Sequence, residues 1–210
     1  MIITRRDRSI TVDLSGPHRA LSHALGHGGF STISTVSWIY VRRADLPMNV
    51  DPLALLRDRL AEAGSPDALG FLTARNLDHI HQAAHGGVTA LATVGLSNAL
   101  RAGDPPAGPP PGTINVLLRV PVPLTDGGLV EALAMTAEAR TLAVREAAWP
   151  SMQSGEPASG TGTDCITVVA PMGPDPQRWC GKHTALGSHI GGAVLEAVSD
   201  GVTTWIEGRS

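Results

Sequence analysis

The chain has 210 residues, of which 42% are hydrophobic and 17% charged, and its formal net charge is -3. This balance excludes a disordered chain, and with no basic run longer than Arg5-Arg6 we expect no nucleic-acid partner. No apolar run is long enough to span a membrane, and the first residues lack the apolar core of a signal peptide, so we expect a cytoplasmic protein without membrane contact.

The apolar patterning predicts strands that alternate with helices. A turn is expected at Gly16-Pro17, and Pro52 opens a helix that Gly64 ends. In chain order, strands are expected at 10–14, 33–41, 69–73, 88–94, 113–120 and 165–170, and helices at 51–64, 76–84, 126–148 and 184–199.

This order predicts one α/β layered domain, with a mixed sheet flanked by helices and an α+β arrangement as the alternative. The Pro- and Gly-rich segment 102–112 is expected to be a surface loop within that domain. The long helix is expected to bury Val130, Ala134, Ala137, Thr141 and Val144, and the last helix Leu186, Ile190, Ala193 and Ala197.

A polar, glycine-rich segment stands directly before the strand at 165–170. Its glycines expose backbone N–H groups, Thr161 and Thr163 add hydroxyls, and Asp164 adds a carboxylate. Such a segment could hold an amide or an oxyanion, or it could be a turn whose Asp caps its own backbone. The residues alone leave both interpretations open.

A second polar segment, Lys182-His183, opens the last helix. Helix N-termini offer free N–H donors, and a His there can act as a base, although an exposed turn is the ordinary alternative. Because the two segments flank one strand-to-helix unit, we expect Asp164 and His183 to converge on a common pocket.

Three further polar residues are candidate site residues. Asn98 and Asn115 lie beside apolar strands, where each must orient a substrate amide or bond a neighbouring backbone group. Glu138 shares a helix face with Glu131 and Arg145, which is typical of a solvated charged stripe.

Histidines at His79, His81 and His85 could bind a metal, but no Glu or Cys joins them, so we predict no metal. The chain has no GxSxG elbow. Cys165 and Cys180 could act as nucleophiles, although a Cys in a buried strand is usually inert.

Nine segments between about residues 20 and 200 carry a recognisable pattern. They are Ala20-Leu21-Ser22-His23-Ala24, Gly28-Gly29, Leu72-Thr73-Ala74, 93–99, 102–105, Gly112-Thr113-Ile114-Asn115, 136–141, 159–164, and 181–184 with 186–187. Taken in order, they resemble the adenosylcobinamide amidohydrolase family. Arg140 stands where a Lys is expected in that family, and His23 and His27 stand where other residues are expected.

The resemblance implies hydrolysis of the amide in adenosylcobinamide that joins the corrin ring's propionyl arm to 1-aminopropan-2-ol, giving adenosylcobyric acid in corrinoid salvage. The corrinoid would be the substrate, with no separate cofactor, and a homo-oligomer stays open. On this hypothesis His183 is the base, oriented by Asp164 or Glu138, and Thr161 and Thr163 hold the oxyanion. The substrate-binding residues would be Asn98, Asn115, Lys182, Ser22 and Gly29.

Three alternatives remain open. Thr113 could be a nucleophile exposed by chain cleavage after Gly112. The protein could instead bind a corrinoid without turnover, with a His on the cobalt. A metal-dependent amidohydrolase acting on another small amide would use His79, His81 and His85.

Overall fold

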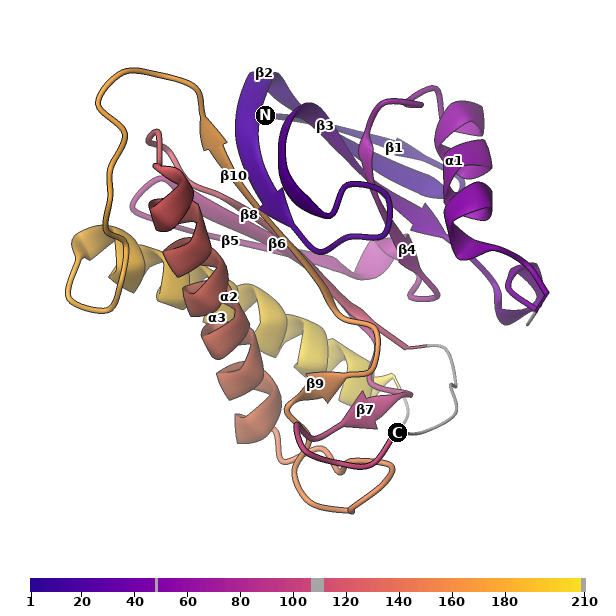
Figure 1. Ribbon diagram of the computed structural model, residues 1–210. Helices are drawn as coiled ribbons and strands as arrows, with labels where there is room; N and C mark the ends of the chain where they lie inside the picture. The colour runs from indigo at the N-terminus through magenta and orange to yellow at the C-terminus, as the bar shows by residue number, and fades with distance from the viewer. Residues whose placement is uncertain (48, 107–111, 209–210) are drawn as a thin grey trace.

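The computed structural model describes residues 1–47, 49–106 and 112–208. Within them, eight strands form one sheet in the order β4-β3-β2-β10-β8-β6-β5, with β1 paired to β2 (Figure 1). The pairs β3–β4 and β8–β10 are parallel and the rest antiparallel, so the predicted α/β class with a mixed sheet is confirmed. The strands are β1 (Ile2–Arg6), β2 (Ser9–Ser22), β3 (Gly29–Tyr40), β4 (Leu69–Thr73), β5 (Ile80–His85), β6 (Val88–Val94), β8 (Ile114–Arg119) and β10 (Cys165–Pro171).

The other elements are three α-helices, two short 3-10 turns and a small two-stranded sheet, all counted over the described residues. The helices are α1 (Pro52–Glu62), α2 (Asp126–Glu146) and α3 (Ala185–Glu207), the turns are η1 (Arg43–Asp45) and η2 (Leu77–His79), and the small sheet joins β7 (Ala99–Leu100) to β9 (Gly160–Thr161).

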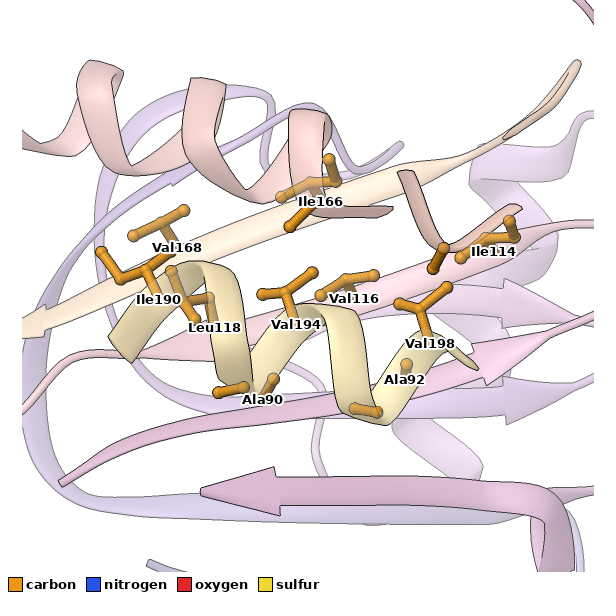
Figure 2. Close-up of a cluster of buried hydrophobic side chains, with 14 of the residues drawn as sticks. Ala90, Ala92, Ile114, Val116, Leu118, Ile166, Val168, Ile190, Val194 and Val198 are labelled. Carbon is orange, nitrogen blue, oxygen red and sulfur yellow. The ribbon is translucent and has the colours of Figure 1, made fainter. Parts of the chain in front are cut away.

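Helices α2 and α3 cover one face of the sheet. Ile190, Val194 and Val198 recur along α3 at helical spacing and pack over β6, β8 and β10 (Figure 2). Ala90 and Ala92 of β6 lie beneath α3, and their small side chains let the helix approach the sheet closely. This is the larger of the cores.

A second core lies on the opposite face, because β2 and β3 bend over it. The pairing of β2 with β3 shifts between Asp13 and His18, and Ser15 and Gly16 take φ angles of 63° and 134°. Residues 14–17 of β2 therefore lie opposite only residue 34 of β3, and such extra residues bend a strand and increase its twist. The turn predicted at Gly16-Pro17 is therefore wrong: these residues form a bulge within one continuous 14-residue strand.

The bend stacks β3 and β4 over the inner face of β8 and β10. Trp38 and Phe71 meet there with ring centroids 4.9 Å apart, and Leu117 and Val169 face them. Helix α1 covers the outer side, where a Cβ at Gly70 would lie 2.6 Å from Leu56 Cδ1, so the strand needs glycine at this point. The layers run from α2 and α3 through two sheet layers to α1.

Several local predictions are wrong for tertiary reasons. Residues 76–84 form η2 and strand β5 instead of a helix, because residues 80–85 pair along their whole length with β6. Helix α2 leaves Val130 51% exposed and buries Leu129 and Ala132, about one residue away from the predicted face. Helix α3 continues to Glu207, beyond its predicted end.

The described residues include no helix that is both long enough and apolar enough to span a bilayer.

Candidate active site between the two sheet layers

A cavity of about 350 Å³ opens at one end of the space between the two sheet layers. Its walls are mainly apolar and come from β4, the segment before α1 and the loop after β2. Its polar end is formed by Asn98, Gly112, Thr113, Thr163 and Cys165. The remaining described lining residues are Leu25, Val41, Leu46, Pro52 and residues 70–74.

Two hydrogen bonds connect the Gly112-Thr113 segment to Thr163 at the polar end of the cavity. The Thr113 hydroxyl donates to the main-chain oxygen of Thr163 at 2.7 Å. The Thr163 hydroxyl in turn donates to the main-chain oxygen of Gly112 at 2.8 Å. Two hydroxyl groups that form hydrogen bonds with the same two chain segments therefore lie at the polar end of an apolar cavity.

Asp164 holds the segment that carries Thr163. Its two carboxylate oxygens accept hydrogen bonds from Ile114 N at 3.0 Å, from Thr161 N at 3.0 Å, from the Thr161 hydroxyl and from the Arg140 guanidinium. Four donors occupy the acceptor sites that a carboxylate offers. Asp164 and Thr161 therefore act as supports for the loop, and the predicted orientation of a histidine by Asp164 is not found.

Asn98 is the other predicted residue that reaches the cavity. It is 5% exposed, and its Oδ1 accepts the Gly162 N–H at 2.7 Å, which connects it to the same loop. A Cβ on Gly162 would lie 3.3 Å from that oxygen, so the loop approaches Asn98 closely. Asn98 and Thr163 thus both line the polar end of the cavity.

Cys165 lines the cavity as a thiol. Burial, and then the neighbouring Asp164 carboxylate, raise the pKa of the Cys165 thiol to about 11. Since the thiolate is the nucleophilic form, Cys165 is poorly suited to attack at neutral pH. Cys180 is fully buried on the opposite face of the sheet, with burial raising its pKa to about 12.

Three other predicted substrate-binding residues serve the fold or lie outside the cavity. Asn115 Nδ2 donates to Leu72 O at 2.9 Å, which ties β8 to β4. The Ser22 hydroxyl is buried against the Thr167 hydroxyl at 2.7 Å. Gly29 begins β3 with a φ of 86° and is not part of the cavity wall.

The structure places Lys182 and His183 at the far end of the molecule. Helix α3 runs along β6, with His189 against Gly86 near its start and Trp205 against Gly95 near its end. Gly95 contacts Thr113, whereas Gly86 lies at the other end of β6, a strand roughly 20 Å long. The predicted convergence of Asp164 and His183 is therefore not found.

Two ion pairs made by helix α2 also indicate that Lys182 and Asp164 lie apart. Lys182 pairs with Glu138, and Arg140 pairs with Asp164. Residues two apart in a helix point to nearly opposite sides, so the two pairs face different parts of the molecule. Glu138 is exposed and contributes nothing to the cavity wall.

The sequence analysis did not predict that His23 and Arg140 lie close to Asp164. His23 Nε2 accepts the Ile166 N–H at 3.0 Å on the helix side of the sheet. Burial, and then the nearby Arg140 charge, lower the pKa of His23, which favours the neutral ring that this bond requires. A signal was present in the sequence, since both positions departed from the expected pattern.

No group of three or more His, Cys, Asp or Glu side chains suited to a metal ion occurs in the described part of the chain. His81 and His85 lie on strand β5 rather than on a helix, and His85 pairs with Glu196 at 2.6 Å.

One family model and two named relatives match most of this chain. The family model for adenosylcobinamide amidohydrolase matches residues 2–210. A Halobacterium salinarum protein named adenosylcobinamide amidohydrolase is 34% identical over 67% of this chain and 62% of its own length, so the chain spans less than two thirds of that relative. A Methanosarcina mazei protein of the same name is 26% identical over 91% of this chain and 94% of its own length.

This chain is also similar to two other proteins. An uncharacterized protein of Methanocaldococcus jannaschii is 37% identical over 41% of this chain and 34% of its own length. Among solved structures, a Burkholderia sp. beta-aminopeptidase gives a TM-score of 0.44 at 16% identity, covering 93% of this chain and 78% of that one.

Proposed function

The chain belongs to the adenosylcobinamide amidohydrolase family, and from this premise we propose that it hydrolyses the amide of adenosylcobinamide that joins the corrin ring's propionyl arm to the aminopropanol. The products are adenosylcobyric acid and 1-aminopropan-2-ol, and the acid returns to cobamide synthesis. The corrinoid is the substrate, and no separate cofactor or nucleic acid takes part. The free thiols Cys165 and Cys180 suit a reducing compartment, so we place the reaction in the cytoplasm.

The observation that carries this proposal is the family match over residues 2–210, combined with a cavity whose polar groups gather at one end. At about 350 Å³ the cavity is near the lower limit for small-molecule sites, roughly 300–1,000 Å³. It therefore suits the aminopropanol arm and not the macrocycle. The corrin would lie at the opening, where Leu25 is 48% exposed.

The residues at the polar end supply two of the groups that amide hydrolysis requires. The Thr113 hydroxyl would attack the carbonyl carbon of the substrate, and the Thr163 hydroxyl would donate to the oxyanion that forms; the hydrogen bonds that place both groups at this end support these roles. Phe71 and Leu72 line the cavity and limit the entry of water, which strengthens those hydrogen bonds. Asn98 adds an amide group beside them.

Product analysis tests the proposal. We expect the purified protein to convert adenosylcobinamide into adenosylcobyric acid and 1-aminopropan-2-ol in equal amounts, both followed by mass spectrometry. Adenosylcobyric acid itself serves as the control substrate, because it lacks the scissile amide. A bound corrinoid with an altered cobalt absorption spectrum and no released amino alcohol would instead identify a corrinoid-binding protein.

A further inference from the structure

The described lining of the cavity contains hydroxyls but no side chain that could act as a base. Its polar side chains are Thr73, Asn98, Thr113, Thr163 and the Cys165 thiol, with no carboxylate, imidazole or ammonium group. A threonine hydroxyl is a weak nucleophile until an adjacent base takes its proton. The base that activates Thr113 must therefore come from another source.

Gly112 and Thr113 lie in the cavity wall, and Thr163 forms a hydrogen bond with each of them. The Thr163 main-chain oxygen accepts from the Thr113 hydroxyl at 2.7 Å, which orients that hydroxyl. The Thr163 hydroxyl donates to the Gly112 carbonyl oxygen at 2.8 Å, which polarises the carbonyl that the hydroxyl would attack. One contact orients the attacking hydroxyl, and the other stabilises the charge that develops on the carbonyl oxygen during a displacement at Gly112.

Gly112 is closely surrounded by polar groups. A Cβ there would lie 2.7 Å from the Ser97 hydroxyl and 2.8 Å from Asn98 N, so only glycine fits without a shift. The absence of a side chain also leaves the Gly112 carbonyl carbon unhindered. Position 112 is thus confined to glycine at the point where the chain enters the cavity.

We propose that the chain cleaves itself between Gly112 and Thr113, and that the α-amino group released on Thr113 is the missing base. The Thr113 hydroxyl oxygen attacks the Gly112 carbonyl carbon, the C–N bond breaks, and the hydroxyl proton passes to the leaving nitrogen. Water hydrolyses the resulting ester, which gives a Gly112 carboxylate and restores the Thr113 hydroxyl. One water is consumed, and no other reactant is needed.

The second part of this inference rests on the proposed function. An α-amino group has an ordinary pKa of about 7.7–8.0, so near neutral pH a fraction of it can accept a proton. It would take the Thr113 hydroxyl proton as that oxygen attacks the substrate amide, and give it to 1-aminopropan-2-ol as the C–N bond breaks. Water then hydrolyses the corrinoid ester on Thr113 and releases the acid.

The fold can hold both fragments after cleavage. Strands β6 and β2 of the first fragment pair with β8 and β10 of the second fragment, respectively. Asn98 remains tied to Gly162 on the other side of the break. The two chains would therefore remain associated through the central sheet.

The test is the intact mass of purified protein during incubation near neutral pH, with sequencing of any new N-terminus. We expect the 21.8 kDa chain to give fragments 1–112 and 113–210, the second beginning at Thr113. Thr113→Ser should still cleave, whereas Thr113→Ala should stay intact. Thr136→Ala is the matched control, because it removes a buried hydroxyl that bonds Ala132 O within α2, and it should cleave like the wild type.

The outcomes separate this inference from the proposed function. Wild-type protein that releases 1-aminopropan-2-ol while remaining at 21.8 kDa overturns self-cleavage and leaves the amidohydrolase function standing. Cleavage at Gly112–Thr113 in protein that never yields adenosylcobyric acid supports self-cleavage and overturns the function. Equal cleavage of Thr113→Ala, with a thermal melt like the wild type, would attribute the break to another agent and overturn the inference.

Discussion

Asp164→Ala is expected to lower the free energy of unfolding by about 3–5 kcal/mol, because it leaves a largely buried guanidinium without its partner. The side chains of Arg140 and Asp164 are only 15% and 8% exposed. The substitution also removes the acceptor for Ile114 N and Thr161 N, two groups that water reaches poorly. Urea denaturation followed by circular dichroism measures the change.

Glu138→Ala provides the matched control on the same helix. Its partner is Lys182, and the two side chains are 56% and 65% exposed, so the pair is solvated and screened. We expect a loss below about 1 kcal/mol. Similar losses in the two variants would show that Asp164 does not organise this part of the fold.

Thr113→Ala is expected to lower the turnover of adenosylcobinamide by about 10³-fold or more, because it removes the attacking oxygen. Corrinoid affinity should change little, since the apolar walls of the cavity are untouched. Steady-state release of 1-aminopropan-2-ol and an equilibrium binding titration separate the two effects.

The turnover of the His183→Ala variant shows whether His183 takes part in catalysis. The sequence predicts this residue as the general base, whereas the structure places it at the other end of α3. We expect its turnover to stay within about twofold of the wild type, a free-energy difference of roughly 0.4 kcal/mol. Loss of turnover in His183→Ala together with full activity in Thr113→Ala would move the active site to the start of α3.

Local signals predicted much of the fold. Strands β4 and β6 have their predicted limits, because each is a short apolar run between turn residues. Helix α1 begins as predicted, with the Asp51 side chain accepting from Leu53 N. The bulge at Ser15-Gly16 and strand β5 were not predicted, because both depend on the pairing of strands that are distant in sequence.

The site was predicted only in part for a related reason. Thr163 and Asn98, which line the cavity, were predicted because polar residues beside apolar strands have to be explained by a bond or a ligand. The link to His183 assumed that loops flanking one strand meet, but β10 separates them by its full length. Arg140 was noted only as a departure from the expected Lys, and its pairing with Asp164 depends on how α2 lies across the sheet.

The most direct measurement of the central claim is a crystal structure of the Thr113→Ala variant with adenosylcobinamide bound. The account predicts an aminopropanol arm inside the cavity between β4 and β8, with its amide oxygen within hydrogen-bond distance of the Thr163 hydroxyl. An empty cavity, with the arm bound beside Lys182 and His183 at the start of α3, would contradict it.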